Sequence, residues 1–253
     1  MSVGRGGRGP AIDGVLFDYG ETLVEFSRPH EALAEAEEQI IEVVGASGRT
    51  APSRATLRAI LARVEREVDE HQERGALDEI DVVAVSLRAY EDAGVKLDHA
   101  LLDEVLRIEQ EAWWHGAHLD QEAIPLLDSL RDRGLRLGLC SNAPYRVESL
   151  HAQLAFVGLE GHLDAVTFSA EIGWRKPSPS IFEAALAALG TSSEHTVMVG
   201  DSERADVAGA HGAGMRAVLI RRIGDSGSSE ADAVIAALRE LPGALRNMCL
   251  YFE

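Results

Sequence analysis

Residues 12–18 read Ile-Asp-Gly-Val-Leu-Phe-Asp, and this stretch decides the fold. A short apolar run that contains β-branched and aromatic residues predicts a buried β-strand ending at Asp18. Similar runs recur at 135–140 (Leu-Arg-Leu-Gly-Leu-Cys) and at 196–200 (Thr-Val-Met-Val-Gly). Helical periodicity fills most of the intervals between the later runs. Strands that alternate with helices predict an α/β fold with a doubly wound, Rossmann-like parallel sheet.

The alternation of helices and strands is regular from about residue 120 onward. The helices predicted there are 122–133, 145–155, 179–189, 203–213 and 236–247. The additional strands predicted there are 163–168, 216–220 and 232–235. Glycines at the ends of several helices mark the turns that lead into the next strand.

The chain between the first strand and this alternating part is purely helical in pattern. It predicts helices near 29–45, 53–74, 79–93 and 98–116, separated by glycine-containing breaks. Four helices with short connections can bury their apolar faces as a small bundle. We therefore expect an α/β core at 10–26 and 117–253 and a helical insertion at 27–116. The Gly- and Arg-rich residues 1–9 predict a disordered tail.

The composition is that of a soluble globular protein, with 253 residues, 46% hydrophobic and 26% charged. A net charge of −18 disfavours nucleic acid and anionic membranes as partners, because both are densely negative. No apolar stretch reaches the roughly 18–20 residues that a transmembrane helix needs. The two cysteines, Cys140 and Cys249, fit no metal or redox spacing. We expect a cytoplasmic protein, monomeric or homodimeric, that acts on a small molecule.

Polar residues follow several of the predicted strands at their carboxyl ends. Asp18 follows the first strand, Ser141 and Asn142 follow the strand at 135–140, and Asp201 follows the strand at 196–200. Each of these alone could be a cap or a turn residue. In open α/β sheets, however, ligands bind at the carboxyl edge of the strands. The pattern therefore predicts a functional site at this edge.

Four motifs carry a resemblance to a known family. They read Val-Leu-Phe-Asp-Tyr-Gly-Glu-Thr-Leu at 15–23, Leu-Cys-Ser-Asn at 139–142, Lys-Pro-Ser-Pro-Ser-Ile-Phe at 176–182 and Val-Gly-Asp-Ser-Glu-Arg-Ala-Asp at 199–206. In this order they closely resemble the motifs of the haloacid dehalogenase-like hydrolase superfamily (the HAD-like hydrolases). The helical insertion after the first motif resembles that family's helical cap.

The resemblance implies a phosphohydrolase that uses Mg²⁺ and a small phosphorylated substrate. Asp18 would be the nucleophile that forms an aspartyl-phosphate. Asp18, the main-chain carbonyl of Gly20, Asp201 and Asp206 would bind the metal, which prefers oxygen ligands. The resemblance further implies that Ser141, Asn142 and Lys176 bind the phosphoryl group. Ser141 and Lys176 would also take part in catalysis.

One position departs from the family's phosphatase pattern. Those enzymes usually carry a second aspartate two residues after the nucleophile, as general acid and base, and here that position is Gly20. Loss of a general acid typically costs about 10²- to 10⁴-fold in rate. The substrate could have a good leaving group, or Glu21 or a cap residue could supply the proton, or the protein could be a catalytically weak or lapsed phosphate-binding or regulatory protein.

A 2-haloacid dehalogenase is the enzymatic alternative, because that branch uses the same aspartate to attack carbon without a metal. Its first motif typically reads Asp-x-Tyr-Gly-Thr, whereas here the Tyr-Gly pair is shifted by one position, which disfavours it. Three residues are candidates for substrate specificity. Arg49 stands in the first connection of the helical insertion, Tyr145 follows the second motif, and Arg175 precedes Lys176.

Overall fold

A computed structural model describes residues 11–221 and 227–248. The predicted tail at 1–9 and Cys249 lie outside these residues. The main sheet has six parallel strands in the order β5-β4-β1-β6-β7-β8. The strands are β1 (Gly14–Phe17), β4 (Arg136–Ser141), β5 (Ala165–Phe168), β6 (Thr196–Gly200), β7 (Arg216–Ile220) and β8 (Ala233–Ile235). The α/β prediction with a doubly wound parallel sheet is confirmed.

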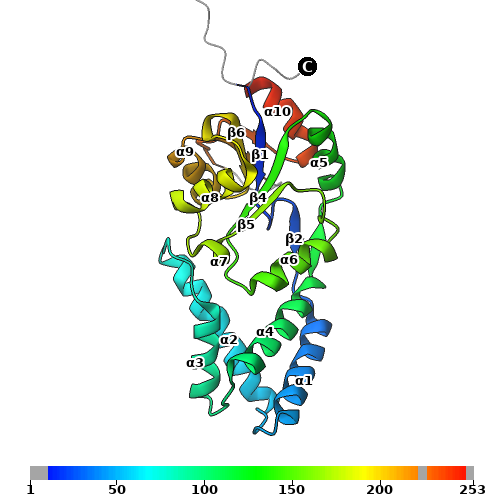
Figure 1. The fold of residues 1–253 in the computed structure, drawn as a ribbon, viewed down its shortest axis with the longest axis vertical. Coiled ribbons are helices and arrows are strands. Elements are labelled where there is room, and N and C mark those ends of the chain that lie inside the picture. The colour runs from blue at the N-terminus through cyan, green and yellow to red at the C-terminus, as the bar shows by residue number, and fades with distance from the viewer. Residues whose placement is uncertain (1–10, 222–226, 249–253) are drawn as a thin grey trace, which may run out of the picture.

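Strand β1 lies in the middle of the sheet, although it comes first in the chain (Figure 1). Its last residue, Phe17, pairs with Leu139 of β4 and with Val199 of β6. This register brings the carboxyl ends of the three strands to one level. The residues that follow them must therefore meet at the same edge of the sheet.

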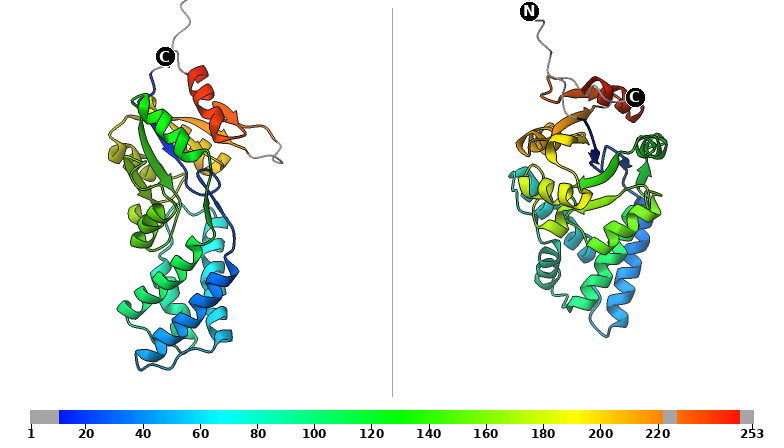
Figure 2. Two further views of the ribbon diagram at one scale, coloured as in Figure 1. Left: turned by 90° about the vertical axis from the view of Figure 1, so that its right-hand side faces the viewer. Right: turned by 45° about the horizontal axis from the view of Figure 1, so that its top comes forward.

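Helices cover both faces of the sheet because successive strand residues point to opposite sides (Figure 2). Val15 and Phe17 belong to one buried cluster, with apolar residues of three helices. Leu16 belongs to the other cluster, with residues of two helices. The helices are α5 (Ala123–Asp132), α6 (Val147–Phe156) and α10 (Leu241–Met248) on the first face, and α8 (Pro179–Leu189) and α9 (Gly209–Gly212) on the second.

Four helices form a separate bundle at the carboxyl edge of the sheet (Figure 1). They are α1 (His30–Ala46), α2 (Arg54–Glu73), α3 (Val82–Asp92) and α4 (His99–Trp114). The bundle has its own buried cluster, which includes Ile40, Leu57 and Leu102. These separate cores support the division of the chain that we propose, with residues 27–116 as the cap.

Two strands that the sequence did not predict connect the bundle to the core. Strand β2 (Val24–Phe26) pairs antiparallel with β3 (Ala117–Leu119), so the chain leaves and re-enters the core side by side. Each strand has only three residues, and most of them are not buried. Such short, half-exposed segments lack the alternation or the apolar run by which strands are recognised in sequence.

The other predicted elements lie within a few residues of the observed ones, with two differences in type. The helix predicted at 203–213 divides into a π-helical segment, η2 (Glu203–Ala208), and the short helix α9. The helix predicted at 236–247 begins with a 3₁₀ turn, η3 (Leu238–Glu240), before α10. Two short elements were not predicted: helix α7 (Ser169–Ile172) and a 3₁₀ turn, η1 (Ser193–His195). None of the described helices is both long and apolar enough to span a membrane.

Candidate active site

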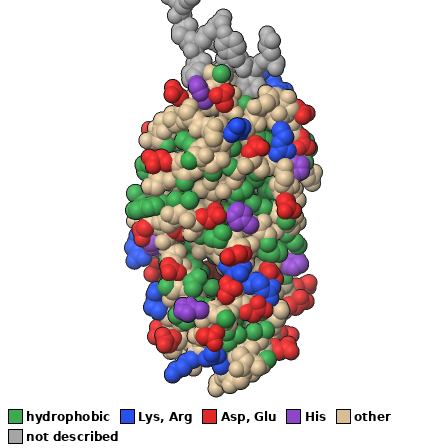
Figure 3. All heavy atoms as spheres, in the orientation of Figure 1, with side chains coloured by type: hydrophobic (Ala, Val, Ile, Leu, Met, Phe, Trp, Pro, Cys, Tyr) green, Lys and Arg blue, Asp and Glu red, His purple; other side chains and the backbone are tan. Residues whose placement is uncertain are grey.

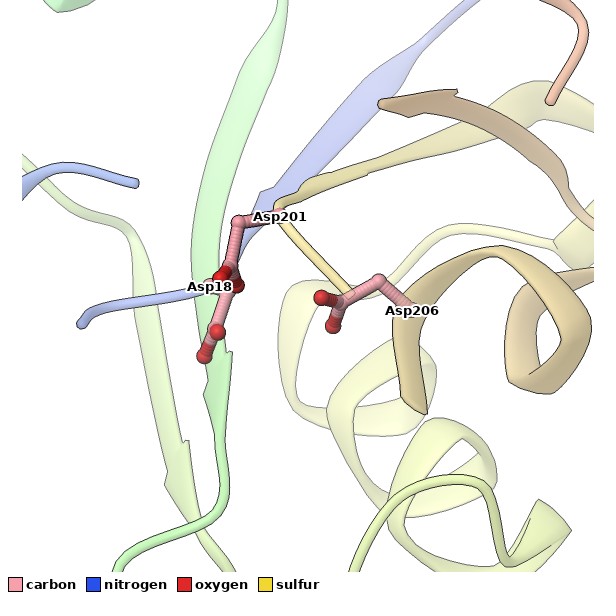
Figure 4. A group of neighbouring side chains, drawn as sticks. All are labelled: Asp18, Asp201 and Asp206. Atoms are coloured by element: carbon pink, nitrogen blue, oxygen red, sulfur yellow. The ribbon is translucent and has the colours of Figure 1, made fainter. Parts of the chain in front are cut away.

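Three aspartates converge at the carboxyl edge of the sheet. Asp18 follows β1, Asp201 follows β6, and Asp206 lies in η2 one turn further on (Figure 4). One carboxylate oxygen from each lies within 4.8 Å of the other two. Asp206 is buried, Asp18 is partly buried, and Asp201 is open to solvent. A ligand can therefore reach this group from the solvent side.

Lys176 lies against two of these carboxylates. Its ammonium nitrogen is 2.8 Å from Oδ1 of Asp18 and 2.6 Å from Oδ1 of Asp206. The lysine side chain is buried, and burial alone would lower its pKa. The charges of Asp18 and Asp206 outweigh that effect and raise the pKa of Lys176, so the ammonium stays charged.

Asp206 is held in place by the local backbone. Its Oδ2 accepts a hydrogen bond of 2.9 Å from the main-chain N–H of Ser202. Gly200, at the end of β6, lies so close that a Cβ there would be 2.2 Å from the Asp206 Cγ. The glycine of the Gly-Asp pair is therefore required by this close approach. A π-helical turn next to such a site is common at functional positions in proteins.

Burial, and after it repulsion from neighbouring carboxylates, raises the pKa of two of the aspartates. Burial, followed by the charges of Asp18 and Asp206, raises the pKa of Asp201 to about 6. Burial also raises the pKa of Asp206, although Lys176 opposes it. Three carboxylates face a single ammonium, so the site carries a surplus of negative charge when all of them are ionised. A cation would relieve this repulsion.

The donor set fits Mg²⁺. It consists of carboxylate oxygens, which are hard ligands, on one side of an accessible edge where waters can complete the coordination. Asp18, Asp201 and Asp206 are the residues that would hold the ion. Gly20 follows Asp18 by two residues. Its main-chain carbonyl is the fourth ligand that the resemblance predicts.

Ser141 and Asn142 follow each other at the end of β4, and both line a cleft together with Tyr19 and Gly20, the residues next to Asp18. Ser141 is buried, with 4% of its surface exposed. The side-chain amide of Asn142 is already engaged: its Nδ2 donates to the carbonyl of Lys176 (3.1 Å), and its Oδ1 accepts from the N–H of Lys176 (2.7 Å). Asn142 therefore fixes the main chain at Lys176, whereas the hydroxyl of Ser141 remains available to a ligand.

The turn after Asp18 is tight. The main-chain N–H groups of Leu23 and Val24 both donate to the carbonyl of Tyr19, at 3.0 and 2.9 Å. Glu21 adopts the left-handed conformation, with φ of 55°, and is exposed. It does not line the cleft that Gly20 lines. The structure therefore gives no support to Glu21 as the substitute acid.

A cleft of about 780 Å³ lies between the core and the bundle. Its floor includes Gly20 and Ser141, and its walls include apolar and aromatic side chains from all four cap helices. Arg28 lies 5.3 Å from the ring centre of Trp113 in this wall and pairs with Glu65. A cleft of this size with a largely apolar lining can hold a small organic molecule.

The cap side of the cleft is acidic. Glu65, Asp69 and Glu109 line it, and within the described part of the chain the carboxylates of Asp69 and Glu109 have no hydrogen-bond or ion-pair partner. Burial, followed by repulsion from Glu65, raises the pKa of Glu109 to about 7. Over the face visible in Figure 3, acidic side chains are spread among Lys and Arg rather than gathered into one patch.

The three predicted specificity residues have different positions. Tyr145 lines the cleft and is 47% exposed, as a substrate contact requires. Arg49 donates to the Lys96 carbonyl and to Asp98. The connection between α1 and α2, in which it stands, lies at the end of the bundle far from the sheet (Figure 1), so the expectation that Arg49 reads the substrate is not supported. Arg175 is buried and paired with Glu79, so it is not available to a substrate either.

Sequence reasoning missed the residues that the cap contributes to this region. Glu109 lies on α4 and Glu79 lies in the connection between α2 and α3. Glutamates are frequent in this helical block, and nothing in the local pattern separates these two from the solvated ones. Only the folded arrangement brings them to the cleft and to Arg175.

Comparison with known proteins gives a consistent result. Residues 12–214 match the family model of the haloacid dehalogenase-like hydrolases. A curated relative, a phosphoserine phosphatase from Thermus thermophilus, is 41% identical over 101 residues, which are 40% of this chain and 40% of that protein. The chain thus matches less than half the length of this curated relative.

Solved structures match over a greater length. A crystal structure of a HAD phosphatase from Thermococcus onnurineus has a TM-score of 0.59 and 27% identity, over 92% of this chain and 98% of that one. A 2-haloacid dehalogenase from Pseudomonas syringae pv. Tomato DC3000 has a TM-score of 0.67 and 26% identity, over 93% and 99%. Both chemistries thus occur on this architecture, and the choice between them depends on the site.

Proposed function

Because the chain belongs to the haloacid dehalogenase-like hydrolase family, we propose that it is a Mg²⁺-dependent phosphohydrolase. Its substrate is a small phosphorylated metabolite, and the reaction passes through an aspartyl-phosphate intermediate on Asp18. The observation that carries this proposal is the convergence of Asp18, Asp201 and Asp206 within 4.8 Å. A group of three carboxylates that can hold a cation favours a phosphatase, because dehalogenation by the same aspartate needs no metal.

The residues divide the reaction as follows. A carboxylate oxygen of Asp18 attacks phosphorus, the bond from phosphorus to the ester oxygen breaks, and the leaving group departs as an anion that takes up a proton from solvent. Bound Mg²⁺ supplies charge neutralisation for the phosphoryl oxygens. Lys176 holds the Asp18 carboxylate in place, and the Ser141 hydroxyl donates to a phosphoryl oxygen. Water then attacks the aspartyl-phosphate, which releases inorganic phosphate and restores Asp18.

The glycine at position 20 limits which leaving groups can depart. No carboxylic acid stands at this position to protonate the departing oxygen, and Glu21 does not line the cleft. The favoured substrates are therefore those whose leaving group departs as a stable anion, such as acyl phosphates, aryl phosphates and anomeric sugar phosphates. Glu109 lines the same cleft, and its pKa, raised to about 7 by burial, leaves it a proton to contribute near neutral pH.

The first experiment measures hydrolysis of p-nitrophenyl phosphate with Mg²⁺, with EDTA, and in the Asp18→Asn variant. We expect activity that requires both the metal and Asp18. The leaving group of this ester departs easily, so the assay tests the nucleophile and the metal without requiring an acid. Turnover of 2-chloropropionate, unaffected by EDTA and without phosphatase activity, would instead establish the dehalogenase alternative.

A further inference from the structure

The cap and the core meet at a contact away from the β2–β3 connection. The loop between α2 and α3 lies against residues 173–175 of the core. The N–H of Glu79 donates to the Gly173 carbonyl (2.9 Å), and the N–H of Arg175 donates to the Leu77 carbonyl (2.8 Å). A β-bridge between Asp78 and Trp174 lies within this pairing. Two backbone segments almost 100 positions apart are thus paired like adjacent strands.

A buried ion pair lies within this contact. Nη1 of Arg175 is 3.0 Å from Oε1 of Glu79, and the two side chains are 7% and 3% exposed. The second carboxylate oxygen of Glu79, Oε2, is buried and has no hydrogen-bond partner among the residues that the structure describes. A buried pair of this kind adds little net stability, because both charges lose their hydration. What it does is fix the position of one segment relative to the other.

Arg175, the member of this ion pair that belongs to the core, directly precedes Lys176 in the chain. The main-chain N–H and carbonyl of Lys176 are both bonded to the side chain of Asn142. The carbonyl of Arg175 accepts from the N–H of Ser178 (2.9 Å). The segment 175–178, which contains Lys176, is therefore fixed by two contacts. Asn142 binds it from the core, and Glu79 binds it from the cap.

We propose that Glu79 is a positioning residue for the reaction. Through Arg175 it fixes the segment from which Lys176 reaches Asp18 and Asp206, so a residue of the cap controls the geometry of the core site. The kinetic part of this proposal rests on the proposed phosphohydrolase function. The structural part, that Glu79 orders residues 173–178, stands without it.

The test compares Glu79→Gln, which keeps the shape and removes the charge, with the control Glu67→Gln. Glu67 forms ion pairs with Arg63 and Arg88 inside the cap and does not touch the core segment. We expect Glu79→Gln to lower kcat for p-nitrophenyl phosphate by about 10- to 100-fold, as a displaced catalytic group does, with KM changed by less than about twofold. Amide hydrogen exchange at 173–178 should become at least about tenfold faster. Glu67→Gln should change neither.

A double-mutant cycle with Arg175→Gln tests whether the two residues act as a unit. If they do, the double variant loses no more activity than the worse single variant. Arg175→Lys keeps the charge on a single nitrogen without the planar guanidinium fork, and it serves as a variant that folds if Glu79→Gln does not. It should lose less activity than Arg175→Gln.

Unchanged exchange at 173–178 in Glu79→Gln would overturn the proposal, and so would faster exchange with an unchanged kcat. If the wild-type protein hydrolyses no phosphate ester, the proposed function fails. The exchange measurement then still decides whether Glu79 orders the segment.

Discussion

The ammonium nitrogen of Lys176 lies 2.8 Å from the carboxylate of Asp18, and only 1% of the lysine side chain is exposed. The lysine is therefore shielded from water, and within the described part of the chain it is the positive charge that pairs with the proposed nucleophile. This relationship gives the most direct test of the site.

Lys176→Met should lower kcat for p-nitrophenyl phosphate by at least about 10²-fold, because the nucleophile and the phosphoryl group lose their charge partner. It should also lower the free energy of unfolding by about 3–5 kcal/mol in the absence of Mg²⁺, because buried carboxylates are left unpaired. Kinetics and urea unfolding measure the two effects. The chain offers a matched control in Lys96→Met, since Lys96 is exposed and is the other lysine of the sequence.

Mg²⁺ should stabilise the folded protein, because it neutralises three carboxylates that repel one another. At a concentration of 100 times its Kd, a ligand adds about 2.7 kcal/mol. For a chain of this size that corresponds to a rise in Tm of roughly 5–10 °C. Thermal unfolding with and without Mg²⁺ measures the rise. Asp201→Asn should remove most of it, and an equal rise in that variant would contradict the assignment of Asp201 as a ligand.

Gly20→Asp should restore a general acid. A Cβ at this position would lie 3.5 Å from the Phe26 ring, which is ordinary contact, so the side chain can be accommodated. Hydrolysis of simple alkyl phosphates should rise by about 10²-fold or more, while p-nitrophenyl phosphate hydrolysis changes little. Gly20→Asn has the same size without the proton and is the control. Equal rates of alkyl phosphate hydrolysis in Gly20→Asp and Gly20→Asn would show that the carboxylic acid at position 20 does not act as a general acid.

Gly200→Ala should disrupt the site through sterics alone. The new Cβ would meet the Asp206 carboxylate at 2.2 to 2.3 Å, so either the strand end or the carboxylate must move. We expect a loss of roughly 1–3 kcal/mol in the free energy of unfolding and a smaller rise in Tm with Mg²⁺. Gly212→Ala is the control, because a Cβ there meets nothing within 4 Å.

Glu109→Gln should stabilise the protein in a pH-dependent way. Burial and Glu65 raise the pKa of Glu109 to about 7 from an ordinary 4.5, so the folded protein retains a proton that the unfolded chain releases. The wild-type protein therefore loses stability as pH rises from about 4.5 to 7. Tyr90 and Tyr145 are the other titratable groups that sense this carboxylate.

The variant lacks this titration, so its advantage over the wild type should grow from near zero at pH 4.5 to on the order of 1–3 kcal/mol at pH 8. Urea unfolding at the two pH values measures the difference. Glu91→Gln, an exposed position on α3, should show no such growth. A constant difference between Glu109→Gln and the wild type at both pH values would exclude the shifted titration.

The core of the site could be predicted from the sequence because it follows from strand ends. Asp18, Ser141 and Asp201 each stand just after or at the end of an apolar run, and parallel strands bring such residues to one edge. The pairing of Glu79 with Arg175 could not be predicted, because the two residues are 96 positions apart and lie in different parts of the fold. Residues in loops that pair across a fold carry no periodic signal.

The position of Arg49 shows a different kind of error. Helix α1 starts next to the core and has 17 residues, so its far end lies about 25 Å away at 1.5 Å per residue. The connection that contains Arg49 must then lie far from the sheet, and the next connection, which contains Glu79, must return to it. Following the helices outward from their connection to the core would have excluded Arg49 as a substrate contact.

The central place of β1 has a consequence for how the protein is made. Gly14 pairs with Arg136 and with Thr196, which are translated 122 and 182 residues later. At about 5–20 residues per second, the ribosome supplies the first partner strand roughly 6–24 s after β1, and the second still later. During that interval the helices of 30–114 can already fold, because all four helices of the bundle, including the α1 and α4 that pack together, have been synthesised. The strand that is synthesised first is therefore among the last to acquire its neighbours, and its apolar residues depend on protection from aggregation until then.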